Sequence, residues 1–472
     1  MASVATPEKR IIIADLSEAE QADLNTLVLQ WRAKRPRNNL RSGFYDMKNG
    51  YRHFMAANVP AVVRRRAFVL GWSAMAVDKL NRRCNLEGFY DATGTDLNAL
   101  GLDTLIRDNR LLSEINQGGS SSLIHAVSWL VTTQGGEGEP DVLINARDAS
   151  SATGIWDRRL RKVTSFLSIH EYDNDGEPVD MTMMLDNLNV TMTRENGAWK
   201  VERRPHIYGV PVDPMRYQYR IDRPFGRSRI TRAVMSLHGQ ALSAMIRADV
   251  NGEAYSLARY VLLGATEEAF QNADGSPKST WQAAWDAVWA IGDDPSAASG
   301  TERADVKQFS GQSPEPQNAH LRMIAQMFSG ETSISIGELG IIGDSNPTSA
   351  EALEVARDDL INEAGQATDG WSPDVSSAVT RALRMANGDV PDDLDLRCHW
   401  RKPMHVSSAA AADAGSKIID KAPWLADSEV GLELLGLSPD QVTRAMADKR
   451  RARGSEILNQ LRERRAVPDP AA

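Results

Sequence analysis

Three short clusters in the sequence contain residue types that could bind a ligand or catalyse a reaction. Residues 118–122 read Gly-Gly-Ser-Ser-Ser, but a phosphate-binding P-loop also needs a lysine after its glycines, and none follows here. Residues 173–176 read Asp-Asn-Asp-Gly, without the alternating ligands and closing glutamate of a calcium loop. Cys398-His399 lacks the second ligand pair of a zinc site, and a histidine such as His125 beside a serine run is more often structural than a triad base. These clusters predict no enzyme, no metal and no cofactor.

Acidic residues form a fourth candidate in the second half of the chain. They are accompanied by one cation, Arg357, and comprise Glu331, Glu338, Asp344, Glu351, Glu354, Asp358 and Asp359. Carboxylates in the first turn of a helix are stabilised by its dipole, which accounts for Glu351 and Glu354. Glu338 and Asp344 lie outside the predicted helices. One interpretation is therefore a metal-dependent nucleic-acid-processing enzyme, with divalent metal around Asp344, Asp358 and Asp359.

The elements that carry these residues follow one another between Phe225 and Leu360, and the first is a long helix. It is preceded by Phe225-Gly226-Arg227-Ser228, in which Ser228 could cap the first turn. Apolar residues then recur at spacings of four and three, which predicts one stripe along roughly 30 residues, or about 45 Å. The stripe consists of Ile230, Val234, Leu237, Ala241, Ala244 and Ala248. A lone helical hairpin is expected to leave this packing stripe partly exposed, which favours oligomerisation.

An insert of about residues 259–316 follows the long helix. Its tryptophans fall at i, i+4 and i+8 of a predicted helix and are Trp281, Trp285 and Trp289. An aromatic stripe of this kind is most often core. A small insert cannot bury three indoles within itself, however, and tryptophan is favoured at interfaces, so we interpret the stripe as partner-binding. Short strands are predicted on either side of this helix, at residues 260–263 and 306–309.

A short helix at residues 317–330 leads into a glycine-rich loop. Gly337, Gly340 and Gly343 recur at every third position, which lowers the cost of rearranging the backbone. The alternative is a rigid turn whose glycines supply positive φ angles. The loop is predicted to end at Asn346-Pro347, because proline cannot continue a helix backwards. A new helix is then predicted from the capping-box spacing of Thr348 and Glu351.

The N-terminal half shows both helical and strand periods. Residues 16–33 and 61–83 have the apolar spacing of amphipathic helices. Between residues 161 and 204 the period changes to two, and Asn196-Gly197 lies between two alternating segments, which is a strong hairpin signal. The chain is therefore predicted to be α+β and mainly helical, with a small antiparallel sheet.

The chain is predicted to end in a basic helix at residues 438–465. Cations suit the negative end of a helix dipole, which accounts for the last arginines. An upstream run is a candidate for contact with DNA or with an acidic neighbour, and consists of Lys449, Arg450, Arg451 and Arg453.

Composition excludes several classes of protein. The chain has 472 residues, 42% of them hydrophobic, which is enough for two or three cores. Its formal net charge of -9 does not suggest a protein that grips phosphate along its whole surface. The two cysteines have no metal-type spacing, which favours a reducing compartment. Since Ile11-Ile12-Ile13 is too short for a signal sequence and no run is long enough for a membrane span, no membrane association is expected.

Several segments, taken in order, resemble the portal proteins of tailed double-stranded-DNA bacteriophages. They are FGRSRITRAVMSLHGQALSAMIRADVNGEAYSLARYVLLG, then SPEPQNAHLRMIAQMFSG and GDSNPTSAEALEVARDDL, with weaker similarity upstream in YDMKNGYRHF and AVDKLNRRCNLEGF. The resemblance implies a ring, expected to be a dodecamer, at a unique capsid vertex through which DNA is packaged and ejected. It also implies terminase, tail adaptor and major capsid or scaffolding proteins as partners, and assembly in the bacterial cytoplasm.

The resemblance also implies a division of the chain into regions. These are a wing (1–224), a first stem helix (225–258), a clip (259–316), a second stem helix (317–330), a channel loop with the following wing helix (331–374) and a crown (375–472). In a ring, Gly337, Glu338, Gly340, Gly343, Asp344 and Asn346 would line the channel, and the two carboxylates would form a collar that repels phosphate. A minor capsid or adaptor protein that binds a portal is the remaining alternative.

Overall fold

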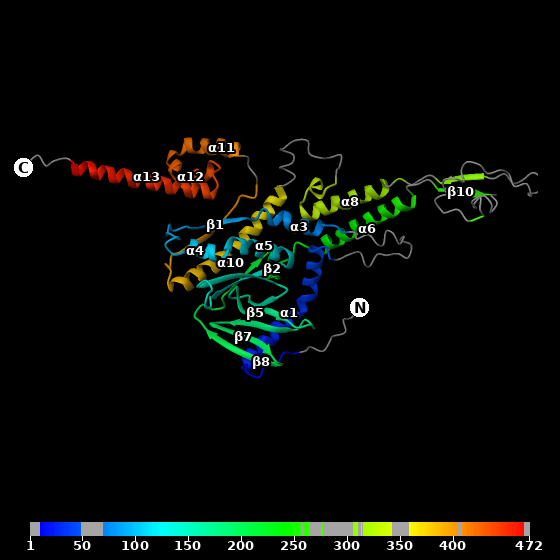
Figure 1. The fold of residues 1–472 in the computed structure, drawn as a ribbon, viewed down its shortest axis with the longest axis horizontal. Coiled ribbons are helices and arrows are strands. Elements are labelled where there is room, and N and C mark those ends of the chain that lie inside the picture. Colours follow the sequence, from blue (N-terminus) through cyan, green and yellow to red (C-terminus); the bar gives the residue numbers. More distant parts are fainter. Residues whose placement is uncertain are drawn as a thin grey trace, which may run out of the picture.

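The computed structural model describes residues 10–48, 69–255, 259–263, 275–276, 305–309, 313, 315–341, 358–404 and 408–466. Figure 1 shows three parts: a mixed body with the N-terminal helix, a pair of helices that projects from it, and a group of C-terminal helices. Among the described residues, no helix is both long enough and apolar enough to cross a membrane. Helices and antiparallel sheets both contribute to the body, so the predicted α+β class is confirmed.

A five-stranded antiparallel meander forms the lower part of the body (Figure 1). Its strands are β4 Ala152–Asp157, β5 Lys162–Tyr172, β6 Pro178–Leu185, β7 Leu188–Glu195 and β8 Ala198–Pro205. The predicted hairpin between β7 and β8 is confirmed. Asn196 and Gly197 both have positive φ angles, 50° and 86°, which is the geometry of a type I′ turn.

Helix α1 (Glu18–Tyr45) covers one face of this sheet. Leu24, Leu27 and Trp31 are buried against strand residues that include Leu167 and Met181. The helix begins with a capping box between Ser17 and Glu20. It continues 12 residues beyond the predicted end at residue 33 and passes through Pro36. Tertiary contacts hold this second part, because Asn38 donates to the Ala149 carbonyl at 2.8 Å.

A second sheet, in the order β3-β2-β9, lies on the other side of the meander. It consists of β2 Val127–Gln134, β3 Val142–Asp148 and β9 Val212–Arg216. The first six residues of β2 are all buried, so this strand has none of the polar alternation that reveals a strand in a sequence. The N-terminal half therefore contains much more sheet than the small one predicted.

Helices that pack on this second sheet, or on one another above it, build the main core. They are α3 Trp72–Asn81, α4 Leu102–Asn109, α5 Leu111–His125 and α10 Asp358–Asn387. Only the last part of the helix predicted at 61–83 is described, and it begins at Trp72. Helix α10 runs unbroken through the predicted boundary between residues 374 and 375 and is buried from Leu360 to Leu383. That boundary is wrong, because the residues on both sides of it belong to one core helix.

The body also includes a short two-stranded sheet of β1 (Leu86–Asp91) and β12 (Leu396–Trp400). Residues 396–400 therefore belong to the body, although the sequence-based division placed them in the crown. Beyond them the C-terminal group consists of α11 Ser408–Lys421, η3 Pro423–Asp427, α12 Glu429–Leu434 and α13 Pro439–Ala466. The predicted final helix is confirmed as α13, and Ser438 and Gln441 form reciprocal contacts at its start.

Two helices, α6 (Arg232–Tyr255) and α8 (Glu315–Thr332), project side by side from the body (Figure 1). The two short strands predicted in the insert are confirmed as β10 (Arg259–Leu263) and β11 (Asp305–Phe309), and they pair antiparallel with each other. Helix α6 begins four residues after Ser228, whose hydroxyl instead donates to the Ile124 carbonyl at 2.6 Å. Thr231 accepts the Val234 N–H at 3.1 Å, so Thr231 caps the helix and the predicted cap at Ser228 is wrong.

Candidate functional site

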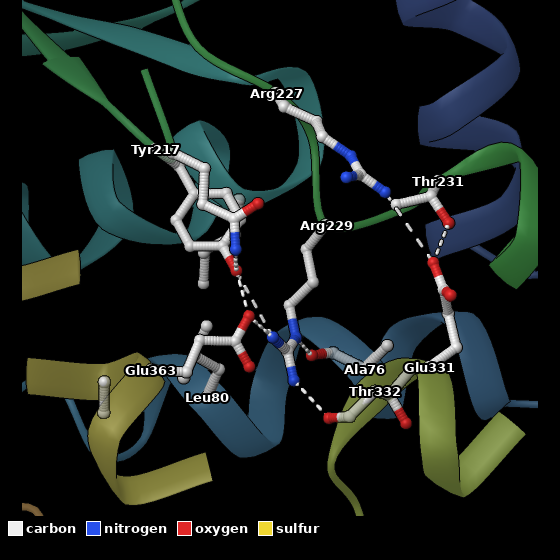
Figure 2. A network of polar contacts seen from close by, with 12 residues as sticks. Ala76, Leu80, Tyr217, Arg227, Arg229, Thr231, Glu331, Thr332 and Glu363 are labelled. Atoms are coloured by element: carbon white, nitrogen blue, oxygen red, sulfur yellow. Dashed lines mark hydrogen bonds and ion pairs between the residues drawn. The ribbon is translucent and has the colours of Figure 1, made fainter. Parts of the chain in front are cut away.

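A buried arginine marks the junction between the two projecting helices and the body (Figure 2). The Arg229 side chain is only 4% exposed and lies just before α6. Its guanidinium donates to the backbone carbonyls of Ala76 and Thr332, the second at 2.6 Å, and it forms an ion pair with Glu363. Four parts of the chain therefore meet at one side chain: α3, the end of α8, α10 and the segment before α6.

Tyr217 completes the polar partners of this arginine. Its hydroxyl donates to the Glu363 carboxylate and accepts from Arg229 at 3.3 Å. Burial raises the pKa of Tyr217 above its usual range, so the phenol keeps its proton and remains a donor. A buried charge is tolerated when it is paired and its donors are satisfied, and Arg229 meets both conditions.

The network connects the two ends of the segment that contains the predicted channel loop. Thr332 ends α8, and Glu363 lies near the start of α10. Residues 333–362 connect these two contacts of Arg229. Whatever conformation that segment adopts, its two ends are held by one buried guanidinium.

An exposed branch lies beside the buried one (Figure 2). The Thr231 hydroxyl donates to the Glu331 carboxylate at 2.9 Å, and Arg227 lies 3.7 Å from the same group. Glu331 is one of the acidic residues noted in the sequence, and its charge is therefore paired at the base of the helical hairpin.

A second buried charge network connects β9 to α10. Arg216 pairs with Asp374 at 3.2 Å, and Arg381 donates to Asp213 at 3.2 Å. The Arg216 guanidinium also lies over the rings of Trp156 and Tyr219 at 4.6 and 4.3 Å. Burial raises the pKa of Asp374 to about 7, although Arg216 acts in the opposite direction.

A cavity of about 360 Å³ opens beside these two networks. It lies between the end of β9 and α10 and is lined by residues that include Tyr217, Tyr219, Glu363 and Asp369. Because Tyr217 and Glu363 are bonded to Arg229, the cavity shares a wall with the buried junction.

Part of the predicted channel loop is described. Ile336–Leu339 form a short 3-10 helix, and Gly340 ends it in the left-handed conformation with φ 80°. Here the glycine satisfies a turn, which is the rigid alternative that the sequence left open. The Glu338 side chain is 14% exposed and lies 3.5 Å from Lys79. Its charge is thus paired within the subunit, which differs from the expected carboxylate that faces a bore.

Several candidates lie outside the described residues. In the predicted loop these are Gly343, Asp344 and Asn346, and in the insert they are Trp281, Trp285 and Trp289. Their assignments stay predictions.

The predicted packing stripe of α6 is covered within the subunit itself. Ile230, Val234, Leu237 and Ala241 are between 0% and 6% exposed and belong to the main core. The expectation that this stripe remains partly exposed is therefore wrong, because α8, α3 and the body bury it. Ile230 also precedes the helix and does not lie on it.

The exposed apolar stripe of the hairpin lies on α8. It consists of Pro316, Ala319, Met323, Met327 and Gly330, all exposed and spaced three or four residues apart. Met323 and Met327 are 50% and 55% exposed. The opposite side of α8 buries Ile324 and Phe328. Sequence reasoning missed this stripe because alanine, glycine and methionine are not distinctive in a helix pattern.

The basic run of α13 is partly engaged within the subunit. Lys449 binds the Asp427 carboxylate at 2.6 Å, and Arg451 lies 2.8 Å from Asp448. Arg450 donates to the Met446 carbonyl of its own helix, and Arg453 is exposed. The run thus forms no separate cationic pocket in the subunit.

The clusters first examined for chemistry have structural roles. Gly118 and Gly119 lie inside α5, where added Cβ atoms would come within 2.9 Å of Met215 and 3.1 Å of Trp371. The Asp173 carboxylate accepts the backbone N–H groups of Asp175 and Glu177 and closes a turn. Within the part of the chain that the structure describes, no three His, Cys, Asp or Glu side chains are grouped to hold a metal ion.

His125 also lacks the surroundings of a triad base. Its ring contacts the hydroxyls of Ser42 at 2.9 Å and Ser121 at 3.4 Å. Burial lowers the pKa of His125. A triad base is oriented by a carboxylate, and the contacts of the His125 ring are to serines.

The sequence matches one protein family and two individual proteins over most of its length. The family described as "Phage portal protein, SPP1 Gp6-like" matches residues 27–435. The portal proteins of Mycobacterium phages D29 and L5 are 25% and 24% identical to this chain, over 398 and 377 residues. The alignments cover 81% and 77% of this chain and 79% and 75% of those proteins.

Solved structures with some similarity come from gene transfer agent particles. The neck of an empty particle computed with C6 symmetry has a TM-score of 0.41 at 16% identity, and covers 78% of this chain and 90% of that one. The neck of a native particle computed with C12 symmetry has a TM-score of 0.38 at 15% identity, and the alignment covers 78% of this chain and 92% of that one.

Because the family match extends over most of the sequence, this chain belongs to the phage portal protein family.

Proposed function

We propose that this subunit assembles into a closed ring at one vertex of a phage capsid, and that double-stranded DNA passes through the ring during packaging and ejection. Membership of the portal family supports the proposal. The observation that carries it within the structure is the exposed apolar stripe of α8. Solvent-exposed methionines on a projecting helix are typical of a surface that another protein covers.

A second copy of the chain is the partner that fits this stripe. The opposite hairpin surface, on α6, exposes Ala233, Ser236 and Gln240, which are small or uncharged and leave room for methionine side chains. A contact between two different surfaces of identical subunits repeats around an axis and closes a ring when the rotation allows it. A dodecamer is the subunit number that we propose.

We propose the remaining partners from the resemblance to the family. The loop between Thr332 and Glu363 is proposed to line the channel, with Asp344 as the carboxylate that repels DNA. The insert at residues 259–316 is proposed to dock terminase and tail adaptor proteins through Trp281, Trp285 and Trp289. The basic run at Lys449 is proposed to lie near packaged DNA or an acidic neighbour, and the body to contact the major capsid or scaffolding protein. Assembly is proposed to take place in the host cytoplasm.

Sedimentation of two α8 variants tests the ring interface. Met323→Glu places a charge on the exposed stripe, and we expect subunits that fold normally but no longer assemble. Asn318→Asp is the matched control, because it adds the same charge at an exposed α8 position outside the stripe, and it should leave the rings intact. Rings of unchanged mass in Met323→Glu would remove α8 from the interface.

A further inference from the structure

The C-terminal helices bury few of their apolar side chains completely. Between residues 408 and 466, the described side chains include only three buried positions, Gly415, Gly431 and Val442. Large apolar residues in the same region are 43% to 74% exposed: Ile418, Trp424, Val430, Ile457 and Leu458. Several leucines of this unit are half-buried, but with so few fully buried side chains it has little apolar burial to offset the entropy lost on ordering. Something else must cover these side chains.

Helix α13 extends away from the other C-terminal helices. Its first half packs on α12, and Lys449 reaches Asp427 in η3 at 2.6 Å. All side chains from residue 451 to 458 are exposed. Figure 1 shows the second half of this helix projecting well beyond α11 and α12. Because the helix is continuous, Ile457 and Leu458 cannot fold back onto the helices of their own subunit.

The charges of the two parts are complementary. Residues 408–437 carry five acidic and two basic side chains, whereas residues 449–466 carry seven basic and two acidic ones. Glu429 and Asp420 are exposed on the acidic part, and Arg453 on the basic part. The projecting half of α13 therefore matches, in both charge and apolar character, a surface that it cannot reach in its own subunit.

We propose that the second half of α13 docks on the α11–η3–α12 surface of the next copy of the chain, with Ile457 and Leu458 against Trp424 and Val430. The inference rests on the proposed ring, in which every subunit has a neighbour in the same orientation. Such a contact joins two different surfaces, so it repeats around the ring and leaves no arm unpaired. It gives the C-terminal helices the apolar cover that a single subunit lacks.

Cross-linking between engineered cysteines tests this arrangement in the full-length assembled protein. The variant carries Trp424→Cys and Ile457→Cys in a Cys398→Ser background, since Cys84 is buried and Cys398 is half-buried. A short bismaleimide should produce a ladder of covalent multimers on denaturing gels. The control pair is Ile207→Cys with Ile457→Cys, because Ile207 is 83% exposed on the wing and should give no ladder.

The outcomes distinguish the inference from the proposed function. Rings without a ladder, or a cross-link within single chains, would overturn the docked arm and leave the portal ring intact. A parent protein that forms no ring would overturn both. If the ladder formed only when another phage protein was present, the docked arm would be overturned, because the other protein would then be what covers the C-terminal helices.

A second variant measures the same contact without cysteines. Ile457→Asp with Leu458→Asp alters two side chains that are exposed in the subunit, so the fold should be unchanged. We expect its rings to dissociate at a protein concentration at least tenfold higher than parent rings. Equal dissociation of the two would contradict the docked arm.

Discussion

The Arg229 guanidinium pairs with the Glu363 carboxylate and simultaneously binds the Thr332 carbonyl at 2.6 Å. One buried side chain thereby fixes the end of α8 to the early part of α10 (Figure 2). In a portal ring, this contact would hold both ends of the proposed channel loop in every subunit. A force on the loop would thus be transmitted to α3, α8 and α10 through the same group.

Arg229→Met should destabilise the subunit strongly. The change leaves the Glu363 carboxylate, which is only 19% exposed, without its cation, and breaking a buried ion pair typically costs about 3–5 kcal/mol. Urea unfolding of the purified protein measures the loss. Arg227→Met is the matched control, because the Arg227 side chain is 52% exposed and its removal should change the unfolding free energy by less than about 0.5 kcal/mol. Equal effects of the two changes would show that the Arg229 network adds little stability.

Leu237→Asp should prevent folding of the subunit and not merely its assembly. Leu237 is 6% exposed in the main core, and an unpaired carboxylate there costs several kcal/mol. Circular dichroism should show loss of the cooperative unfolding transition, whereas Met323→Glu should retain it. A Leu237→Asp protein that is folded but monomeric would contradict this prediction and would indicate that the α6 stripe forms the ring interface.

Stability should fall as the pH rises through the range in which Asp374 ionises. The pKa of Asp374 is about 7 in the folded protein because of burial, against roughly 4 in an unfolded chain. The folded state therefore holds the proton more tightly, and the unfolding free energy decreases between about pH 4 and 7. Asp374→Asn should show a flatter profile than the parent. The same slope in both proteins would assign the pH dependence to other groups, and exposed Asp389→Asn serves as the control.

Asp344→Lys tests the proposed channel collar. One added cation per subunit would create a ring of positive charge that binds DNA phosphates in a salt-dependent way. Capsids should still assemble, while packaging slows most at low salt. Packaging at the parental rate across a salt series would place Asp344 away from the channel. Glu338 is not a suitable partner in this variant, since its charge pairs with Lys79.

Trp285→Ala tests the proposed partner-binding role of the insert at residues 259–316. Rings should form normally, but we expect weaker recovery of the tail adaptor in co-purification, because tryptophans are frequent anchors of protein interfaces. Unchanged recovery of the adaptor would indicate that the tryptophan stripe is part of the core of the insert. Loss of rings would indicate that it lies in the contact between subunits.

The hairpin of the meander and the final helix were predictable because each carries a local signal. Asn196-Gly197 fixed the β7–β8 hairpin, and Ser438 preceded the final helix as a cap. The sequence analysis missed strand β2 and the continuity of α10, for different reasons. β2 is buried on both faces and shows no alternation, whereas the Pro373 of α10 suggests a break that its buried neighbours Trp371 and Val375 override.

The candidate site was much less accessible to sequence reasoning. Nothing in the local pattern around Arg229 indicates that Ala76, Thr332 and Glu363 converge on it, because all three are distant in the sequence. The two carbonyl groups, of Ala76 and Thr332, belong to residues 153 and 103 positions away. The α6 stripe was recognised as a packing surface, but periodicity alone cannot say whether the packing partner is the same subunit or the next one. That distinction depends on the tertiary arrangement, which buries α6 and leaves α8 exposed.

Electron microscopy of the purified full-length protein tests the central claim most directly. We expect closed rings with an axial hole and a particle mass that is a whole multiple of the subunit mass. Met323→Glu should disperse these rings into smaller particles. Particles of the parent protein that remain monomeric at micromolar concentration across a range of salt, with no ring in any image, would contradict the central claim.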